Sequence, residues 1–145
     1  MNNLKSTLNN IFGHLELYRN LKDIITPTLK KINLDEFNGV GLEIGGPSKI
    51  FRKSIPVYKR AKSIDFVNFS NNTIWEGEIL NLELVSYYNK KKGRRLISEA
   101  SELKFKIDRP YDFIISSNCL EHVANPIKAL KRWKEVLKVN GKMIL

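Results

Sequence analysis

The chain has 145 residues, 42% of them hydrophobic and 28% charged, which is the composition of one soluble globular domain and excludes a disordered or fibrous chain. Its single cysteine, Cys119, excludes an internal disulfide and fits a reducing cytoplasm, and no apolar run is long enough to span a membrane. The net charge of +10 suits a nucleic acid, an acidic substrate or an anionic membrane surface, and equally a surface that is simply rich in lysine.

The first segment, residues 1–39, is predicted to be mainly helical and separate from the domain that follows. Apolar residues recur at three- and four-residue steps between residues 3 and 33, which is the spacing of one helix face. Pro27 is expected to break this pattern or to start a second short helix capped by Thr26. The segment is interpreted either as a helix packed beside a sheet or as a lid over a substrate.

A short apolar strand is predicted at residues 40–45, and a tight glycine turn follows it at Gly45-Gly46-Pro47-Ser48. Pro56 excludes one long helix through the next segment. A second strand is predicted at residues 63–69, and it carries Asp65, twenty residues after Gly45. A strand, a glycine turn and an acid about 20 residues on form the layout of a nucleotide-type site in a Rossmann-like fold.

The middle of the chain gives weaker signals. Residues 71–92 are predicted to be irregular and then helical around Leu80–Tyr88. The run at residues 89–95 is expected to be a basic loop, either solvated or in contact with phosphate. A weak third strand is predicted at residues 95–98.

The last third of the chain gives clear signals. A fourth strand is predicted at residues 111–117, and Asn125 and Pro126 are expected to open a helix that closes at Asn140-Gly141. A fifth strand follows from Lys142. The expected buried face of the helix consists of Ile127, Leu130, Trp133, Val136 and Leu137.

Strands that alternate with helical stretches predict an α/β fold with a mostly parallel, Rossmann-like sheet over residues 40–145. Because a doubly wound sheet normally continues past a fifth strand, the domain is expected to be truncated. The missing part would hold the last strands and much of an acceptor pocket.

The glycine turn is a poor fit for a pyrophosphate. Gly45 and Gly46 allow close backbone approach of a ligand, but Pro47 lacks one of the N–H groups that a pyrophosphate needs at a helix start. This favours S-adenosylmethionine, which carries no phosphate, over NAD. Asp65 is placed to accept hydrogen bonds from ribose hydroxyls, and Glu43, in an apolar run, needs donors or a cationic ligand to stay ionised.

Residues 40–145 resemble the class I methyltransferases, most closely the small-molecule methyltransferase-11-like group. Glu43-Ile44-Gly45-Gly46-Pro47-Ser48 is similar to their first motif, although Pro47 stands where a third glycine is usual. Asp65 matches their ribose-binding acid, and Glu99-Ala100 is similar to the acid and alanine that contact the adenine. Residues 111–123 resemble their fourth strand and the motif after it.

The resemblance implies an S-adenosylmethionine-dependent methyltransferase. The cofactor-binding residues would be those of the matched motifs: Glu43, Gly45, Gly46, Pro47, Asp65, Phe66, Glu99, Ala100, Ser117 and Asn118. His122 is the candidate general base, with ordering of the loop after the fourth strand as its alternative role. Two histidines and one cysteine, widely spread, predict no metal site.

The expected methyl acceptor is a small molecule or a saccharide. A nucleic-acid acceptor is possible but less favoured, because amino-methylating enzymes of that kind usually resemble Asn/Asp-Pro-Pro-Tyr/Phe after the fourth strand. This chain has Asn118-Cys119-Leu120-Glu121 there. A third alternative is a truncated, non-catalytic binding module.

Overall fold

The computed structural model describes residues 32–73, 77–78 and 80–145. The chain divides into two compact units, Met1–Asn33 and Leu34–Leu145, and all the elements discussed below belong to the second unit. The predicted N-terminal helix lies outside the described residues, and the expected domain boundary after residue 39 stays a prediction.

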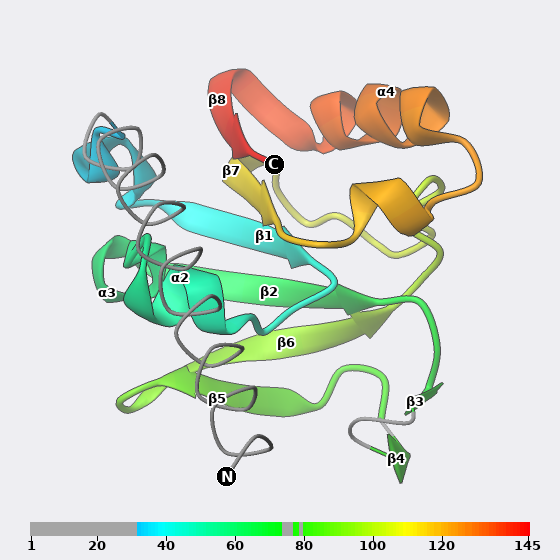
Figure 1. Cartoon of the computed structure of the whole chain (residues 1–145), viewed down its shortest axis with the longest axis horizontal. Coiled ribbons are helices and arrows are strands. Elements are labelled where there is room, and N and C mark those ends of the chain that lie inside the picture. The colour runs from blue at the N-terminus through cyan, green and yellow to red at the C-terminus, as the bar shows by residue number, and fades with distance from the viewer. Residues whose placement is uncertain (1–31, 74–76, 79) are drawn as a thin grey trace, which may run out of the picture. The chain divides into compact units, whose positions relative to one another are not determined.

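The second unit is built on a six-stranded sheet in which all neighbours are parallel except for one edge strand (Figure 1). That edge strand, β5, runs antiparallel to β6. From one edge to the other the order is β5 (Leu84–Tyr88), β6 (Lys91–Ile97), β2 (Ser63–Asn68), β1 (Val40–Ile44), β7 (Tyr111–Ser116) and β8 (Leu137–Ile144). The predicted α/β fold with a mostly parallel, Rossmann-like sheet is therefore confirmed.

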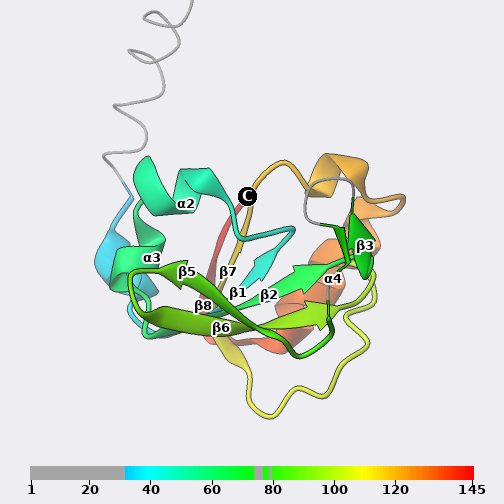
Figure 2. The ribbon, with the colours of Figure 1, turned by 90° about the horizontal axis from the view of Figure 1, so that it is seen from below.

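Helices cover both faces of the sheet (Figure 2). On one face lie α2 (Lys49–Lys53) and α3 (Val57–Arg60), and on the other lies α4 (Pro126–Val136). The remaining short elements are η1 (Leu34–Phe37), η2 (Leu120–His122) and a small hairpin of β3 (Asn72–Thr73) and β4 (Gly77–Glu78). The link from β6 to β7 contains no helix or strand.

Each face has its own apolar core because side chains alternate across a strand. On the α4 side, Leu42 and Ile44 pack in one cluster with Trp133. On the α2–α3 side, the rings of Tyr58, Phe66 and Tyr87 meet edge to face with centroids 5.2 to 6.4 Å apart. Tyr58 comes from α3 and Tyr87 from β5, so this aromatic cluster fastens the edge strand to the helices.

Several predicted elements are confirmed. The strands expected at residues 40–45, 63–69 and 111–117 are β1, β2 and β7, each ending one residue early. Pro56 separates α2 from α3. The cap of α4 is also as predicted, because the Asn125 side chain accepts a hydrogen bond from the Lys128 N–H at 2.9 Å.

The helix predicted around Leu80–Tyr88 is wrong, because residues 84–88 form strand β5. The predicted basic loop is also wrong over most of its length. Only Asn89 and Lys90 form the turn, and β6 begins at Lys91. Pairing with β6 and burial of the Tyr87 ring decide the conformation of this segment, and neither is visible in local spacing.

The predicted C-terminal boundary of α4 is wrong. The helix ends at Val136, and Leu137 is already extended and pairs with Tyr111 of β7. Asn140 and Gly141 therefore lie within β8, where Asn140 has a positive φ of 64°. Ile127, expected on the buried face, is 62% exposed, whereas Ala129, Trp133 and Val136 are buried.

Candidate functional site

The carboxyl ends of four neighbouring strands meet at one edge of the sheet. Ile44, the last residue of β1, is level with Val67 of β2 and Ser116 of β7, and Asn68 is level with Ile97 of β6. In open α/β sheets, ligands bind outside this edge, near the point where the strand order reverses. Here the reversal lies at β1, because the chain builds outward from β1 in both directions.

The glycine turn follows β1 at this edge. Gly45 has a φ of +81°, a conformation that side chains with a Cβ rarely adopt, and its N–H donates to the Val67 carbonyl at 2.8 Å. A Cβ at Gly45 would come within 3.1 Å of the Cys119 Cβ. Pro47 follows through a cis peptide and is half-buried. The turn thus lies between β2 and the loop after β7.

Glu43 supports this turn from inside the protein. Its carboxylate is fully buried and accepts hydrogen bonds from the Ser48 N–H at 3.0 Å, from the Ser48 hydroxyl and from the Tyr58 hydroxyl at 2.5 Å. A Cβ on Gly46 would lie 2.2 Å from the Glu43 Cδ, so glycine is required for this close approach. The predicted cofactor residue Glu43 is therefore satisfied by protein donors, and it ties β1, the turn and α3 together.

Burial raises the pKa of Glu43 to about 7, although the hydrogen bonds from Ser48 and Tyr58 partly oppose that rise. Burial, together with the neighbouring Glu43 carboxylate, also raises the pKa of the Tyr58 hydroxyl. Tyr58 therefore stays a neutral donor while Glu43 changes charge near neutral pH.

Asn68 was not singled out from the sequence, yet it lies at the centre of the edge. Its Nδ2 donates to the Gly46 carbonyl at 3.3 Å, which links the end of β2 to the glycine turn. Its Oδ1 is buried and accepts no hydrogen bond within the described part of the chain. An unpaired buried acceptor costs about 1 to 3 kcal/mol, which points to a missing donor.

Asp65 lies further inside the sheet than predicted. It is level with Leu42, two residues before the edge, and is 8% exposed. Its carboxylate accepts hydrogen bonds from the Arg94 N–H at 3.0 Å, the Arg94 guanidinium at 2.8 Å and the Tyr111 hydroxyl at 3.1 Å. The next residue, Phe66, is fully buried in the aromatic cluster of the opposite face. Ligand binding by Asp65 and Phe66 stays a prediction.

The segment after β6 is anchored to α4. Glu99 is exposed, and its carboxylate accepts hydrogen bonds from the N–H of Ser101 at 2.6 Å and from the Ser101 hydroxyl. Ala100 is buried, and its carbonyl accepts a hydrogen bond from the Trp133 indole at 2.7 Å. The predicted adenine-contacting pair therefore stands at the same edge as the glycine turn, on a loop held by an α4 side chain.

The loop after β7 supplies the remaining candidates. Ser117 is half-buried, and Asn118 is exposed with a positive φ of 53°. Cys119 is half-buried beside Gly45, and burial raises the pKa of its thiol. His122 is exposed at the end of η2, and its N–H donates to the Cys119 carbonyl at 3.0 Å. A catalytic role for His122 stays a prediction.

Two classes of site have no support in the described residues. No group of three or more His, Cys, Asp or Glu side chains is arranged there to hold a metal ion. None of the helices in that part of the chain has both the length and the apolar character needed to cross a membrane.

A protein-family model described as "Methyltransferase domain" matches residues 14–145, which is most of the chain. Comparisons with curated proteins and with solved structures gave no match.

Proposed function

Because the chain belongs to this methyltransferase-domain family and is a class I methyltransferase, we propose that it transfers a methyl group from S-adenosylmethionine to a small molecule or a saccharide. The observation that carries the choice of cofactor is the edge built by Gly45, Gly46 and Asn68. A soluble, cytoplasmic enzyme is part of the proposal, supported by the single cysteine.

The residues at this edge fit S-adenosylmethionine. The backbone at Gly45 and Gly46 has no Cβ and leaves room for close approach of the methionine part. The buried, unpaired Oδ1 of Asn68 offers an acceptor to a ribose hydroxyl. Glu99 and Ala100 are assigned to the adenine, and Ser117 and Asn118 to the floor below the methyl group. When bound, the cofactor would supply a methyl group on a sulfonium sulfur, and S-adenosylhomocysteine would be the leaving group when the acceptor takes the methyl group.

The protein's part in such a reaction is to orient the acceptor and keep water away from the methyl group. Glu43, Ser48 and Tyr58 hold the glycine turn in one conformation, so the turn is organised before a ligand arrives. His122 is proposed as the general base for a hydroxyl or amine acceptor.

The contacts of Asp65 assign it an indirect role in this proposal. Its carboxylate already accepts hydrogen bonds from Arg94 and Tyr111, whereas the Oδ1 of Asn68 accepts none within the described residues. Asn68 is therefore the better candidate for direct contact with the ribose. An amide in this place is neutral and can also donate, whereas an acid would only accept.

Isothermal titration of the full chain with S-adenosylmethionine tests the cofactor, with NAD as the comparator. We expect binding of S-adenosylmethionine alone. Asn68→Ala is expected to weaken it roughly tenfold, the effect of about one to two kcal/mol for a lost hydrogen bond. Asp65→Asn, the matched control in the same strand, is expected to leave the affinity of the folded protein within about threefold. If the full chain binds no S-adenosylmethionine, the proposal is wrong.

The base is tested separately by release of S-adenosylhomocysteine in the presence of candidate acceptors. His122→Ala is expected to lower turnover by roughly a hundredfold without changing cofactor affinity. Unchanged turnover in this variant would remove His122 from the mechanism.

A further inference from the structure

The positive charge of the chain is concentrated in two segments. Residues 44–64 contain six of the 25 Lys and Arg residues, residues 84–98 contain five more, and neither segment contains any of the 15 Asp and Glu residues. The rest of the chain holds 14 cations against 15 carboxylates. The net charge of +10 is therefore a local property of these segments and does not come from a lysine-rich surface in general.

The two segments lie side by side on the face that carries α2 and α3. Lys91, at the start of β6, donates from its Nζ to the carbonyls of Tyr58 at 3.2 Å, Lys59 at 3.0 Å and Ala61 at 2.6 Å. The Tyr58 and Tyr87 rings pack between α3 and β5 with centroids 5.2 Å apart. The cations of the two helices and of the β5–β6 turn consequently belong to one surface.

Most of these cations have no anionic partner. Within the described part of the chain, no ion pair involves Lys49, Arg52, Lys53, Lys59 or Lys62 of the helical segment, and all five are exposed. The same holds for Lys90 and Lys92 of the hairpin. We call these seven residues the basic surface. Seven neighbouring cations without carboxylates repel one another and attract a polyanion.

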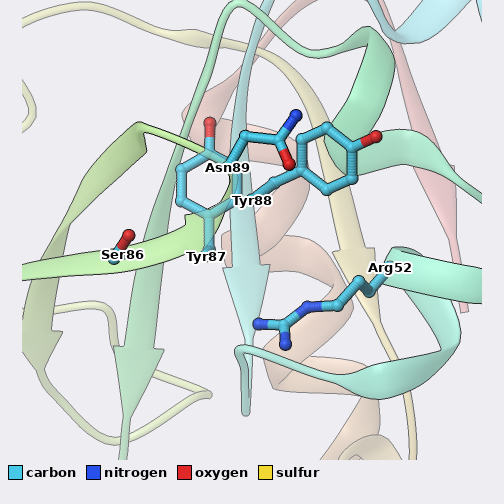
Figure 3. Close-up of a pocket in the computed structure, with 5 residues that line it drawn as sticks. All are labelled: Arg52, Ser86, Tyr87, Tyr88 and Asn89. Carbon is cyan, nitrogen blue, oxygen red and sulfur yellow. The ribbon is translucent and has the colours of Figure 1, made fainter.

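A pocket of about 350 Å³ adjoins the basic surface at Arg52 (Figure 3). It is lined by Arg52 from α2 and by Ser86, Tyr87, Tyr88 and Asn89 from β5 and the turn after it. Tyr88 is half-buried, and Arg52 and Asn89 are exposed, so the pocket offers an aromatic ring, a guanidinium and an amide together. Aromatic rings that stack on bases, beside cations that contact phosphates, are the means by which proteins hold single-stranded nucleic acid.

We propose that the basic surface and its pocket dock single-stranded nucleic acid. A membrane surface fits less well, because a membrane-bound surface places exposed apolar side chains among its cations. The exposed large hydrophobic residues of the described part of the chain are Phe69, Leu80, Leu82, Leu84, Ile127, Val139 and Leu145. Of these, Leu84 alone lies in the two charged segments, and it stands at the opposite end of β5 from the turn that carries Lys90.

Most of the docking surface lies away from the edge assigned to S-adenosylmethionine, and Lys49, which follows the glycine turn directly, is the member nearest to it in the chain. Lys62 donates its N–H to the Gly39 carbonyl just before β1, and the turn at Lys90 precedes β6, so much of the surface lies toward the amino ends of the parallel strands. Binding at this surface therefore does not depend on the proposed methyl transfer.

The test is fluorescence anisotropy of a labelled single-stranded oligonucleotide of about 20 residues, titrated with the full chain without S-adenosylmethionine at several salt concentrations. Contacts to about five phosphates predict a slope of log affinity against log salt of about −3.5. Charge reversal in the triple variant Arg52→Glu, Lys59→Glu, Lys90→Glu is expected to make this slope shallower by about 2 and to weaken binding more than tenfold.

The matched control reverses three exposed lysines outside the basic surface, Lys106→Glu, Lys131→Glu and Lys134→Glu, and is expected to lose much less affinity. A second variant, Tyr88→Leu, is expected to weaken nucleic-acid binding roughly tenfold while leaving binding to inorganic polyphosphate unchanged. Circular dichroism establishes that each variant is folded before it is compared.

Three outcomes would overturn the proposal. The first is that the two triple variants lose the same affinity for the oligonucleotide, which would mean that only the net charge of the chain matters. The second is that the wild type binds vesicles that contain phosphatidylserine more tightly than it binds the oligonucleotide. The third is that it binds polyglutamate as tightly as the oligonucleotide. Loss of S-adenosylmethionine binding in titration, by contrast, would count against the proposed function and leave this result untouched.

Discussion

At the scale of single residues, the buried carboxyl of Glu43 is the group whose charge state matters most. It is held by Ser48 and Tyr58 and has a pKa of about 7, above the ordinary value of 4.5. The folded state thus binds a proton that the unfolded chain releases at lower pH. The stability that this proton gives is complete below about pH 4.5 and is lost as the pH rises through 7.

The first prediction follows from this loss of stability with rising pH. Between pH 5 and pH 8 the wild type is expected to lose about 2 to 3 kcal/mol of its free energy of unfolding through Glu43, at about 1.4 kcal/mol per pH unit. Glu43→Gln removes this loss, because the carboxamide oxygen still accepts from Ser48 and nothing titrates. Urea unfolding at both pH values measures the free energy of unfolding of the wild type and the variant. Glu121→Gln, which changes an exposed carboxyl, is the control, and equal pH dependence in all three proteins would contradict the prediction.

At this scale the sequence locates the residues that are contiguous in a motif. Glu43, Gly45 and Gly46 stand together in the chain and together in the structure. Tyr58 was missed because it meets Glu43 only through the fold, fifteen residues on. The sequence did not indicate Asn68, because the expected ribose acceptor was an acid, Asp65, and the one signal for Asn68 was its place near the end of the predicted second strand.

At the scale of elements, α4 is the support of the loop that follows β6. The Trp133 indole donates to the Ala100 carbonyl at 2.7 Å, and the Arg132 guanidinium donates to the Glu102 carbonyl at 2.8 Å. These bonds take the place of a helix between β6 and β7, because they fix a segment that has no secondary structure of its own.

The second prediction concerns this support. Trp133→Phe removes the indole donor, leaves the Ala100 carbonyl unpaired and opens a small cavity, so a loss of about 2 to 3 kcal/mol is expected in chemical denaturation. Limited proteolysis is expected to cut the segment 98–110 faster than in the wild type. Lys134→Ala, on the exposed side of the same helix, should change stability by less than about 0.5 kcal/mol. A similar small change in Trp133→Phe would show that the support is unimportant.

The sequence predicts elements where local signals agree and fails where distant pairing decides. Strands β1, β2 and β7 are short apolar runs between turn residues, and the start of α4 has both a cap and a proline. Residues 84–88 are Leu-Val-Ser-Tyr-Tyr, and their valine and tyrosines favour a strand, but the spacing of apolar residues around them also suits a helix. Pairing with β6 selects the strand. The end of α4 is set in the same way by the pairing of Leu137 with Tyr111.

At the scale of the whole molecule, the uneven distribution of charge has a cost in stability. The basic surface gathers seven cations without partners in the described structure, and their repulsion acts in the folded state more than in the extended chain. Salt screens this repulsion over a distance of about 10 Å at 0.1 M.

The third prediction is that raising sodium chloride from about 20 to 300 mM stabilises the wild type by about 1 kcal/mol. The triple variant Arg52→Glu, Lys59→Glu, Lys90→Glu should lose most of this salt effect, whereas Lys106→Glu, Lys131→Glu, Lys134→Glu should keep it. Thermal unfolding at each salt concentration measures the difference. Salt responses that do not differ between the two variants would argue against repulsion within the basic surface.

Lys91 stands between two lysines of this surface and differs from both. Its Nζ donates hydrogen bonds to three backbone carbonyls at the end of α3, so these bonds must break before the nitrogen can reach a reagent. An amine-acylating reagent should therefore label Lys90 and Lys92 quickly. It should label Lys91 at roughly one tenth of their rate or below, since the three hydrogen bonds must open first. Mass spectrometry of peptides from briefly labelled native protein, with urea-unfolded protein as the reference, makes Lys91 an internal reporter of whether the hairpin is docked on α3.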